Sequence, residues 1–364
     1  MNARAAVLYA PRDLQVESFE VPDVGVDDAI LRVEACGLCG TDHELYTGSM
    51  SAPYPIIPGH ESVGIIEDIG PEAAERWGVS VGDRVALECW QSCRVCEACV
   101  AGKYRRCSEH GQTDIYGLKS SATRPALFGG YATHHYLSPD SLVLPVPDVL
   151  DPVEATLFNP LGAGIKWGVE VPGTGPGDIV AVLGPGIRGL CAVAAAKEAG
   201  ADFVMVTGYG DRDHPRLELA SAFGADLVVD VATNDLAKEL RAATGGRLAD
   251  VVVDVTANAP AAFGQAVRVA AVGARLVFAG VRGSRETPGL NPDAIMYKEL
   301  TIMGTLGVDA PVYRQALELL ATRKFPFDLL TRRVVGLEEA GDLLNSMAGN
   351  SSEPPPVHGV IVPA

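Results

Sequence analysis

Four of the chain's eight cysteines stand close together, at Cys93, Cys96, Cys99 and Cys107. Their spacing allows two chemistries, disulfide bonds or a metal ion held by thiolates. Disulfide frameworks are typical of short secreted domains rich in cysteine, whereas this chain has 364 residues and is sparse in cysteine. Short loops between thiolates allow the sulfur atoms to converge on a tetrahedral Zn²⁺ ion. The cluster therefore predicts a structural zinc site, with redox thiols or chance clustering as the alternative.

Two shorter motifs, CGTD and PGHE, also contain metal-ligand residue types. Cys39 and His60 stand beside glycine-bounded turns and can supply two zinc ligands. Glu61 can be a third ligand or a base close to the metal. Asp42 is suited to accept the second ring N–H of His60, which would fix the tautomer of the imidazole. Taken singly, residues of these types are more often structural, so that interpretation stays open.

The stretch VLGPGIRGL places Gly184, Gly186 and Gly189 in a G-x-G-x-x-G array. A predicted strand precedes the array and a predicted helix follows it. In that context the first glycine allows a tight turn, the second allows close approach of a pyrophosphate, and the third allows close helix–strand packing. The array predicts a dinucleotide site, with a structural glycine-rich turn as the alternative. The remaining candidate cofactor contacts are Ile187, Arg188, Gly208, Arg216 and Thr256.

The choice between NAD and NADP depends on the end of the next predicted strand. An acid at this position normally binds the adenosine ribose, but here the residue is Gly208. Its absence removes a repulsion against a 2′-phosphate, and three basic residues just beyond could bind one: Arg212, His214 and Arg216. Two acids of the same segment could serve the ribose instead: Asp211 and Asp213. Both readings stay open, as does a solvated loop that carries all five charges.

The elements that must position these residues fall into two patterns. Residues 1–157 consist of short β-like runs broken by glycine and proline, which indicates an irregular, strand-rich domain. Residues 158–303 alternate apolar strand candidates with helix candidates, which is typical of a doubly wound parallel sheet. The strand candidates there are 178–184, 202–207, 226–230, 250–256 and 274–280, and the clearest helix candidates are 190–201 and 216–225.

Composition excludes several functional classes. The formal net charge is −17 and no basic run stands out, so we expect no nucleic-acid partner. No uninterrupted apolar stretch reaches the roughly 18 residues that a membrane span needs. The N-terminal apolar run is too short for a secretory signal, so we expect a cytoplasmic protein with reduced thiols.

With these motifs in this order, the chain resembles the zinc-dependent medium-chain dehydrogenase/reductase superfamily, which includes alcohol and polyol dehydrogenases. The resemblance covers essentially the whole chain and depends on CGTD, GHE, the four-cysteine cluster and GPGIRGL. It implies an α/β protein with a GroES-like, β-rich catalytic domain over residues 1–157. It also implies a Rossmann domain with a doubly wound parallel sheet over 158–303 and a C-terminal return to the catalytic domain over 304–364.

The resemblance further implies roles for individual residues. Cys39 and His60 match the ligands of a catalytic zinc, and the four clustered cysteines match the ligands of a structural zinc. Thr41 matches the hydroxyl that binds the substrate alcohol and passes its proton outward. The other matched positions are Asp42 as the acid behind the zinc ligand, Glu61 as the glutamate near the metal, and Glu44, beside His43, where many relatives have a proton-relay histidine.

One position departs from the family pattern. The third protein ligand of the catalytic zinc is normally Cys, Asp or Glu, but Asn159 stands there, and a neutral amide is a poor zinc ligand. We therefore expect Cys39, His60 and Glu61 to hold the catalytic zinc, because a thiolate and a carboxylate together neutralise Zn²⁺. The alternatives are a weakly held or absent metal, and an Asn159 that only caps the turn before Pro160.

The predicted function is a zinc-dependent oxidoreductase that transfers a hydride between an alcohol and NAD(P)⁺, giving an aldehyde or ketone. One structural and one catalytic Zn²⁺ are expected. Two alternatives on the same fold are a zinc-poor carbonyl reductase and a non-catalytic dinucleotide-binding protein. The intact Cys39, Thr41, His60 and Glu61 argue against the non-catalytic protein.

Two further expectations concern partners. Three large apolar residues at substrate positions of the family hint at a hydrophobic alcohol rather than a free sugar: Trp90, Phe128 and Leu306. Family resemblance also implies a homo-dimer or homo-tetramer that pairs through the edge of the Rossmann sheet. We expect that edge near residues 274–281 and the segment that follows.

Overall fold

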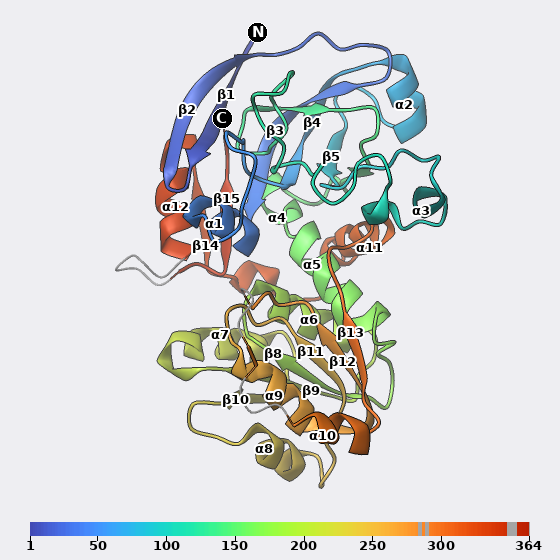
Figure 1. Ribbon diagram of the computed structural model, residues 1–364, viewed down its shortest axis with the longest axis vertical. Helices are drawn as coiled ribbons and strands as arrows, with labels where there is room; N and C mark the ends of the chain where they lie inside the picture. The colour runs from blue at the N-terminus through green and yellow to red at the C-terminus, as the bar shows by residue number, and fades with distance from the viewer. Residues whose placement is uncertain (283–285, 288–290, 348–354, 364) are drawn as a thin grey trace. The chain divides into compact units, whose positions relative to one another are not determined.

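The computed structural model describes residues 1–282, 286–287, 291–347 and 355–363. The chain divides into two compact units (Figure 1). The first consists of Met1–Phe158, Asp309–Thr322 and Thr331–Ala364, and the second of Asn159–Val308 and Arg323–Leu330. The C-terminal part of the chain thus contributes to both units, since the short segment 323–330 belongs to the second.

The first unit is built on strands. β1 (Asn2–Ala10) pairs antiparallel with β2 (Asp13–Glu20), and seven further strands form a second sheet. Its order is β14-β15-β3-β4-β5-β7, with β6 also paired to β3. These strands are β3 (Ala29–Leu38), β4 (Glu61–Ile69), β5 (Arg84–Leu87), β6 (His134–Leu137), β7 (Val143–Pro145), β14 (Arg332–Val335) and β15 (His358–Ile361).

The C-terminal strand β15 supports the segment that leads to Cys39. It pairs antiparallel with β3, with Val360 opposite Gly37 and Gly359 opposite Leu38. The helices and turns of this unit are α1 (Gly40–Thr47), α2 (Pro71–Trp77), α3 (Glu97–Val100), η1 (Tyr104–Arg106), α4 (Pro152–Ala155), α11 (Ala310–Ala321), η4 (Leu337–Glu339) and α12 (Ala340–Met347).

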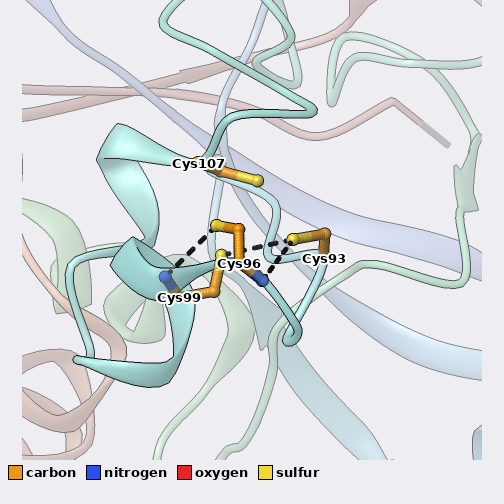
Figure 2. Close-up of side chains that lie close together, drawn as sticks. All are labelled: Cys93, Cys96, Cys99 and Cys107. Atoms are coloured by element: carbon orange, nitrogen blue, oxygen red, sulfur yellow. Dashed lines mark hydrogen bonds between the residues drawn. The ribbon is translucent and has the colours of Figure 1, made fainter.

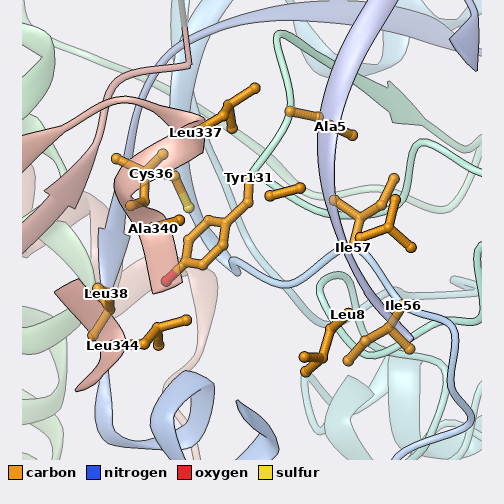
Figure 3. Close-up of a cluster of buried hydrophobic side chains, with 14 of the residues drawn as sticks. Ala5, Leu8, Cys36, Leu38, Ile56, Ile57, Tyr131, Leu337, Ala340 and Leu344 are labelled. Carbon is orange, nitrogen blue, oxygen red and sulfur yellow. The ribbon is translucent and has the colours of Figure 1, made fainter. Parts of the chain in front are cut away.

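A buried apolar cluster holds the first unit together. Figure 3 shows Tyr131 at its centre, surrounded by side chains from β1, β3, η4 and α12. Its labelled members include Leu8, Leu38, Leu337 and Leu344, all at most 5% exposed. Burial of such side chains stabilises the folded state by about 1.5–3 kcal/mol each. The core therefore joins the C-terminal helix α12 to strands from the beginning of the chain.

The second unit contains one sheet of six strands, all parallel. Its order is β10-β9-β8-β11-β12-β13, so the direction of winding reverses between β8 and β11. This is the order of a dinucleotide-binding doubly wound sheet, and the prediction of that fold is confirmed. The strands are β8 (Ile179–Leu183), β9 (Phe203–Gly208), β10 (Leu227–Asp230), β11 (Ala249–Asp254), β12 (Ala270–Phe278) and β13 (Thr301–Gly304).

Helices connect these parallel strands, as right-handed crossovers require. Reversal of the winding at β8 and β11 places the connecting helices on opposite faces of the sheet. The helices and turns of this unit are α5 (Phe158–Ile165), the π-helical turn η2 (Lys166–Glu170), α6 (Ile187–Glu198), α7 (Gly210–Ala222), α8 (Leu236–Ala243), α9 (Ala261–Val269), α10 (Pro292–Tyr297) and η3 (Phe327–Leu329).

Two local expectations are corrected. Residues 274–281 do not form the sheet edge, because most of them belong to β12, which lies between β11 and β13. The edge strands are β10 and β13, of which β13 follows β12, and parts of the segment after residue 281 lie outside the described residues. The charged segment 211–216 is helical rather than a loop, since α7 begins at Gly210. Two acids in its first turn favour this early start by complementing the positive end of the helix dipole.

Helices in both units are short. The longest in the described chain is α7, with 13 residues. None of the described helices combines the length and the apolar character needed to cross a membrane.

Candidate functional site

The CGTD motif forms the N-terminus of helix α1. Cys39 is the N-cap residue, and its Sγ accepts a hydrogen bond from the backbone N–H of Thr41 at 3.3 Å. In return, Oδ2 of Asp42 accepts from the backbone N–H of Cys39 at 3.0 Å. This reciprocal capping satisfies two helix-terminal donors and holds the thiol and the carboxyl group in fixed positions.

His60 precedes β4 and lies between the two capping side chains. Its Nε2 is 3.1 Å from Sγ of Cys39, and its Nδ1 is 3.4 Å from Oδ1 of Asp42. Asp42 also accepts a hydrogen bond from the backbone N–H of Gly59 at 3.2 Å. In the tautomer that carries its proton on Nδ1, beside Asp42, the Nε2 lone pair lies on the side of Cys39. A metal ion ligated by Cys39 and His60 would therefore be remote from Asp42 across the ring, which fits an orienting role for this acid.

The electrostatics of this group favour a cation. Burial disfavours a charged imidazole, but the negative charges of Cys39 and Asp42 outweigh it and raise the pKa of His60 well above its ordinary value. Burial would likewise raise the pKa of Asp42, yet His60 and the N–H groups of Cys39 and Gly59 lower it. The Cys39 sulfur and Nε2 of His60, both buried, are donor types that fit Zn²⁺, and Asp42 lies at the opposite ring nitrogen.

The third zinc ligand stays a prediction. Glu61 is 3% exposed, but the group whose ligand atoms lie within 4.8 Å of one another consists of Cys39, Asp42 and His60. The Glu61 carboxylate lies against Gly37, where an added Cβ would be only 2.3 Å from Oε2. Asn159 is 6% exposed and is the second residue of α5, so it lies inside a helix rather than in a turn before Pro160.

The remaining predicted catalytic residues lie on α1. Thr41, His43 and Glu44 are half-buried. Nδ1 of His43 is 3.2 Å from the carbonyl oxygen of Leu344 in α12, so this ring nitrogen donates to backbone. His43 is thereby fixed against the C-terminal helix, while Glu44 occupies the predicted relay position.

The four clustered cysteines converge as the spacing predicts. Figure 2 shows these four side chains close together, and their sulfur atoms lie within 4.8 Å of one another. All eight cysteines of the chain are free thiols. Backbone N–H groups of Cys96 and Cys99 donate to the sulfurs of Cys93 and Cys96 at 3.4 and 3.5 Å. The N–H groups of Ser108 and Cys99 lower the pKa of Cys96 to about 6. These hydrogen bonds stabilise the thiolate of Cys96, whereas burial raises the pKa of Cys99 to about 11. The four converging sulfurs fit a closed metal site.

The cysteine lobe, residues 93–107, is anchored by residues that the motifs did not single out. The Tyr104 hydroxyl donates to Oε2 of Glu88 at 2.7 Å and accepts from the N–H of Ala310 at 2.6 Å. Arg105 pairs with Asp309 at 3.0 Å. The lobe therefore caps the N-terminus of α11. Glu88 is fully buried, and burial raises its pKa to about 7.

The glycine array has the geometry that phosphate binding requires. Gly184 follows β8 with a φ of +103°, and an added Cβ would lie 3.0 Å from Thr256. Gly186 is the N-cap of α6 without a side-chain cap, and no atom lies within 4 Å of an added Cβ. At Gly189 a Cβ would be 1.9 Å from the carbonyl oxygen of Gly184. Open space thus adjoins the uncapped N–H groups of α6, which fits a pyrophosphate.

Neighbouring predicted contacts lie in the same unit. Ile187 and Arg188 form the first turn of α6, and the Arg188 guanidinium lies over the ring of Trp167 at 5.6 Å. Thr256 lies just beyond β11, and its hydroxyl donates to Asp254 at 2.6 Å. Because β8 and β11 are adjacent, Thr256 lies at the point where the winding reverses.

The ion pair between Asp254 and Arg282 was not predicted from the sequence. Asp254 is fully buried, and Arg282 also donates to the carbonyl oxygens of Thr256 and Gly280 at 2.9 and 2.7 Å. This pair fixes the loops after β11 and β12. The position of Asp254 at the carboxyl end of an apolar strand was the available signal.

The three predicted substrate residues have different surroundings. Trp90 and Phe128 are buried in the first unit, at 7% and 5% exposure. Leu306 belongs to the second unit and is 60% exposed. The backbone N–H of Trp90 donates to the buried Glu88 at 3.1 Å, which fixes the backbone at this position.

Comparison with known families matches both units. The model of the family described as "Alcohol dehydrogenase GroES-like domain" matches residues 25–148. The model described as "Zinc-binding dehydrogenase" matches residues 189–322. The matched ranges include all seven predicted zinc ligands and, of the glycine array, Gly189, whereas Asn159 lies in neither range.

Individual relatives match over the whole chain or about half of it. A Mycobacterium tuberculosis protein named "Probable alcohol dehydrogenase" is 59% identical over 361 residues, which cover 99% of this chain and 98% of that protein. Sorbitol dehydrogenase of Bacillus subtilis is 35% identical over 204 residues, covering 55% of this chain and 54% of that protein. A zinc-binding dehydrogenase structure from Sinorhizobium meliloti with bound NADP has a TM-score of 0.85 and 28% identity, with both chains fully covered.

Proposed function

The chain belongs to the zinc-dependent medium-chain dehydrogenase/reductase superfamily, and from that premise we propose how its residues carry out the reaction of an alcohol dehydrogenase. The enzyme transfers a hydride between an alcohol and NAD(P)⁺, giving an aldehyde or ketone. The observation that supports this function most directly is the buried group of Cys39, Asp42 and His60 in a chain that also contains the glycine array.

We assign two zinc ions to each chain. Cys93, Cys96, Cys99 and Cys107 would hold one, in a closed site that supports the fold. Cys39 and His60 would hold the other, with Glu61 as the third protein ligand and Asn159 outside the ligand set. When bound, the second zinc supplies Lewis-acid chemistry that polarises the substrate oxygen.

The residues around the catalytic metal site have separate tasks. The Thr41 N–H donates to the Cys39 sulfur and so helps to hold this ligand atom in place. Asp42 holds the Nδ1 proton of His60, which keeps Nε2 available as a ligand atom. The Thr41 hydroxyl accepts the proton that leaves the alcohol oxygen, with Glu44 as the next group outward.

The chemistry balances as a two-electron oxidation. The carbinol C–H bond breaks and its electron pair moves with the hydrogen to the nicotinamide, while the hydroxyl proton leaves through Thr41. Gly184, Gly186 and Gly189 let the backbone of α6 approach the pyrophosphate, and Ile187, Arg188 and Thr256 are further candidate contacts.

Zinc content and turnover together test this function. Purified protein should contain about two zinc ions per chain and form NADH or NADPH with an alcohol. Cys39→Ala should lower the zinc content by about one and abolish turnover, whereas binding of the dinucleotide should remain. One zinc per chain with carbonyl reduction would favour a zinc-poor reductase, and dinucleotide binding without any turnover would favour a non-catalytic protein.

We infer a hydrophobic alcohol as the substrate, supported by the large apolar side chains of Trp90, Phe128 and Leu306 at family substrate positions. A panel of primary, secondary, aromatic and polyol substrates tests this inference. A clear preference for free sugars would overturn it.

We also propose that the protein is a homo-dimer or homo-tetramer that pairs through strand β13. β13 is an edge strand, and Ile302 on it is 39% exposed. Met296, Tyr297 and Leu306 nearby are 62%, 76% and 60% exposed. An apolar edge strand needs covering, and a second copy would provide it. Sedimentation that shows only monomer at micromolar concentration would contradict this proposal.

We place the protein in the cytoplasm. All eight cysteines are free, and four of them form the candidate structural zinc site, which requires reduced thiols. Cell fractionation would test the location.

A further inference from the structure

The end of strand β9 lacks the acid that normally accepts hydrogen bonds from the adenosine ribose. Gly208 is the last residue of β9, the second strand of the βαβ unit that contains the glycine array. A ribose with a free 2′-hydroxyl needs an acceptor there, whereas a 2′-phosphate needs a cation. The side chains that surround Gly208 therefore decide which dinucleotide is preferred.

Asp213 fills the space above Gly208. An added Cβ at position 208 would lie 2.9 Å from the Cβ of Asp213 and 3.1 Å from Leu217. Asp213 is on the first turn of α7, and its Oδ2 accepts from the backbone N–H of Tyr209 at 3.0 Å. The Asp213 carboxyl group thus lies against the end of β9, next to the position that the side chain of a residue other than glycine at 208 would occupy.

Of the three basic residues of this segment, Arg216 is the one that is largely buried, and it faces an acid. Arg216 is 3.6 Å from Asp213, and each of the two side chains is only 18% exposed. His214 is 74% exposed and pairs with Glu218, and Arg212 is exposed as well. The one basic residue that is held against the strand end is therefore already balanced by the acid.

A second acid adds negative charge at the same place. Oδ1 of Asp230, at the end of β10, accepts from the backbone N–H of Gly210 at 2.8 Å and that of Ala232 at 2.9 Å. The two carboxylates of Asp213 and Asp230 and the guanidinium of Arg216 together carry a net charge of −1. A 2′-phosphate carries a charge of about −2, so it would be repelled here.

We propose that Asp213, reaching from helix α7 over Gly208, replaces the missing strand-end acid and makes the enzyme selective for NAD(H). The proposal rests on the proposed function, since it concerns the same dinucleotide site. A carboxylate has about four lone-pair positions. Those of Asp213 that Tyr209 and Arg216 leave available accept hydrogen bonds from the ribose hydroxyls.

Binding measurements test this without turnover. Titration of the purified, zinc-loaded enzyme, followed by fluorescence of the reduced nicotinamide, should show NADH binding at least about tenfold tighter than NADPH, the effect of one charged hydrogen bond. ADP-ribose should likewise compete better than its 2′-phosphorylated form, which places the discrimination at the adenosine ribose. Equal or tighter binding of NADPH overturns the proposal but leaves the proposed function intact. Failure of both dinucleotides to bind would contradict the proposed function itself.

Matched variants assign the discrimination to one side chain. Asp213→Asn should weaken NADH binding by about tenfold, leave NADPH binding unchanged or tighter, and so abolish the preference. Glu218→Gln removes an equal charge from an exposed position on the same helix and should leave the preference at the wild-type ratio. Equal effects of these two variants, or a larger effect of Asp211→Asn, would overturn the assignment. If Asp213→Asn does not fold, the competition between the two ADP-ribose forms on the wild-type protein still decides between NAD and NADP.

Discussion

Replacing Asp42 by Asn tests whether this acid positions the catalytic zinc ligand. Asp42 accepts from the N–H groups of Cys39 and Gly59 and faces Nδ1 of His60. The amide keeps the shape of the side chain but offers one oxygen in place of two. In either orientation its NH₂ group points at a donor, so at least one buried hydrogen bond is lost.

The magnitude follows from those contacts. Loss of one charge-assisted hydrogen bond in a fully buried site costs about 1.5–3 kcal/mol of the free energy of unfolding. The His60 ring is also held less firmly in one orientation. Loss of a carboxylate that orients a zinc-binding histidine weakens zinc binding by about 10–100-fold. The structural zinc, held by the four clustered cysteines, should be unaffected.

Competition with a chromophoric chelator measures the effect. Wild-type protein should release its two zinc ions in two phases, and Asp42→Asn should release one of them at a lower chelator concentration. Asp254→Asn is the matched control, because Asp254 is also fully buried and hydrogen-bonded but belongs to the second unit. Denaturation by urea should show a loss of stability in both variants. Unchanged release of both zinc ions from Asp42→Asn would refute an orienting role for this acid.

Three further changes give distinct outcomes. Cys99→Ser should lower the zinc content by about one per chain and the melting temperature of the protein, and unchanged values of both would contradict a structural zinc site. Burial raises the pKa of Glu88 to about 7 from an ordinary 4.5, so the folded state keeps a proton that the unfolded state has lost, and stability falls as pH rises through that window. Between about pH 5 and pH 8 the free energy of unfolding of Glu88→Gln should fall by about 3 kcal/mol less than that of the wild-type protein. Urea denaturation that shows the same pH dependence for both proteins would contradict this. Asn159→Asp should leave zinc affinity unchanged while Glu61→Gln lowers it, and tighter zinc binding in Asn159→Asp would reverse the assignment of the third ligand.

The sequence alone determined the fold class and the closed metal site. Continuous apolar runs such as β8 are buried on both faces, and that pattern is specific to parallel sheets covered by helices. The four-cysteine spacing is equally local, because short loops restrict where the sulfurs of Cys93, Cys96, Cys99 and Cys107 can lie. Periodicity and short-range spacing are properties of the chain itself, so both features could be read without coordinates.

Helix boundaries and sheet edges needed the tertiary structure. The charged segment from Asp211 to Arg216 has little apolar periodicity, and its helical state is supported by the turn at Gly210 and by the hydrogen bond from the Tyr209 N–H to Asp213. Which strand lies at the edge depends on the order of all six, and β13 follows a segment without a clear strand pattern. Neither choice is encoded in a short window of sequence.

Contacts between distant segments decided how the candidate site is supported. Cys39 and His60 are 21 residues apart, and the fold places Asp42 at the opposite ring nitrogen of His60, as the motifs predicted. Only the fold showed that Asp42 also accepts from the backbone N–H of Gly59. Tyr104 and Ala310 are 206 residues apart in the chain, so their hydrogen bond could not be expected from either motif. The sequence by itself therefore determined which residue types are present for zinc and dinucleotide chemistry. Only the tertiary structure decided which side chains hold them in place, because hydrogen bonds and burial join positions whose separation along the chain carries no signal.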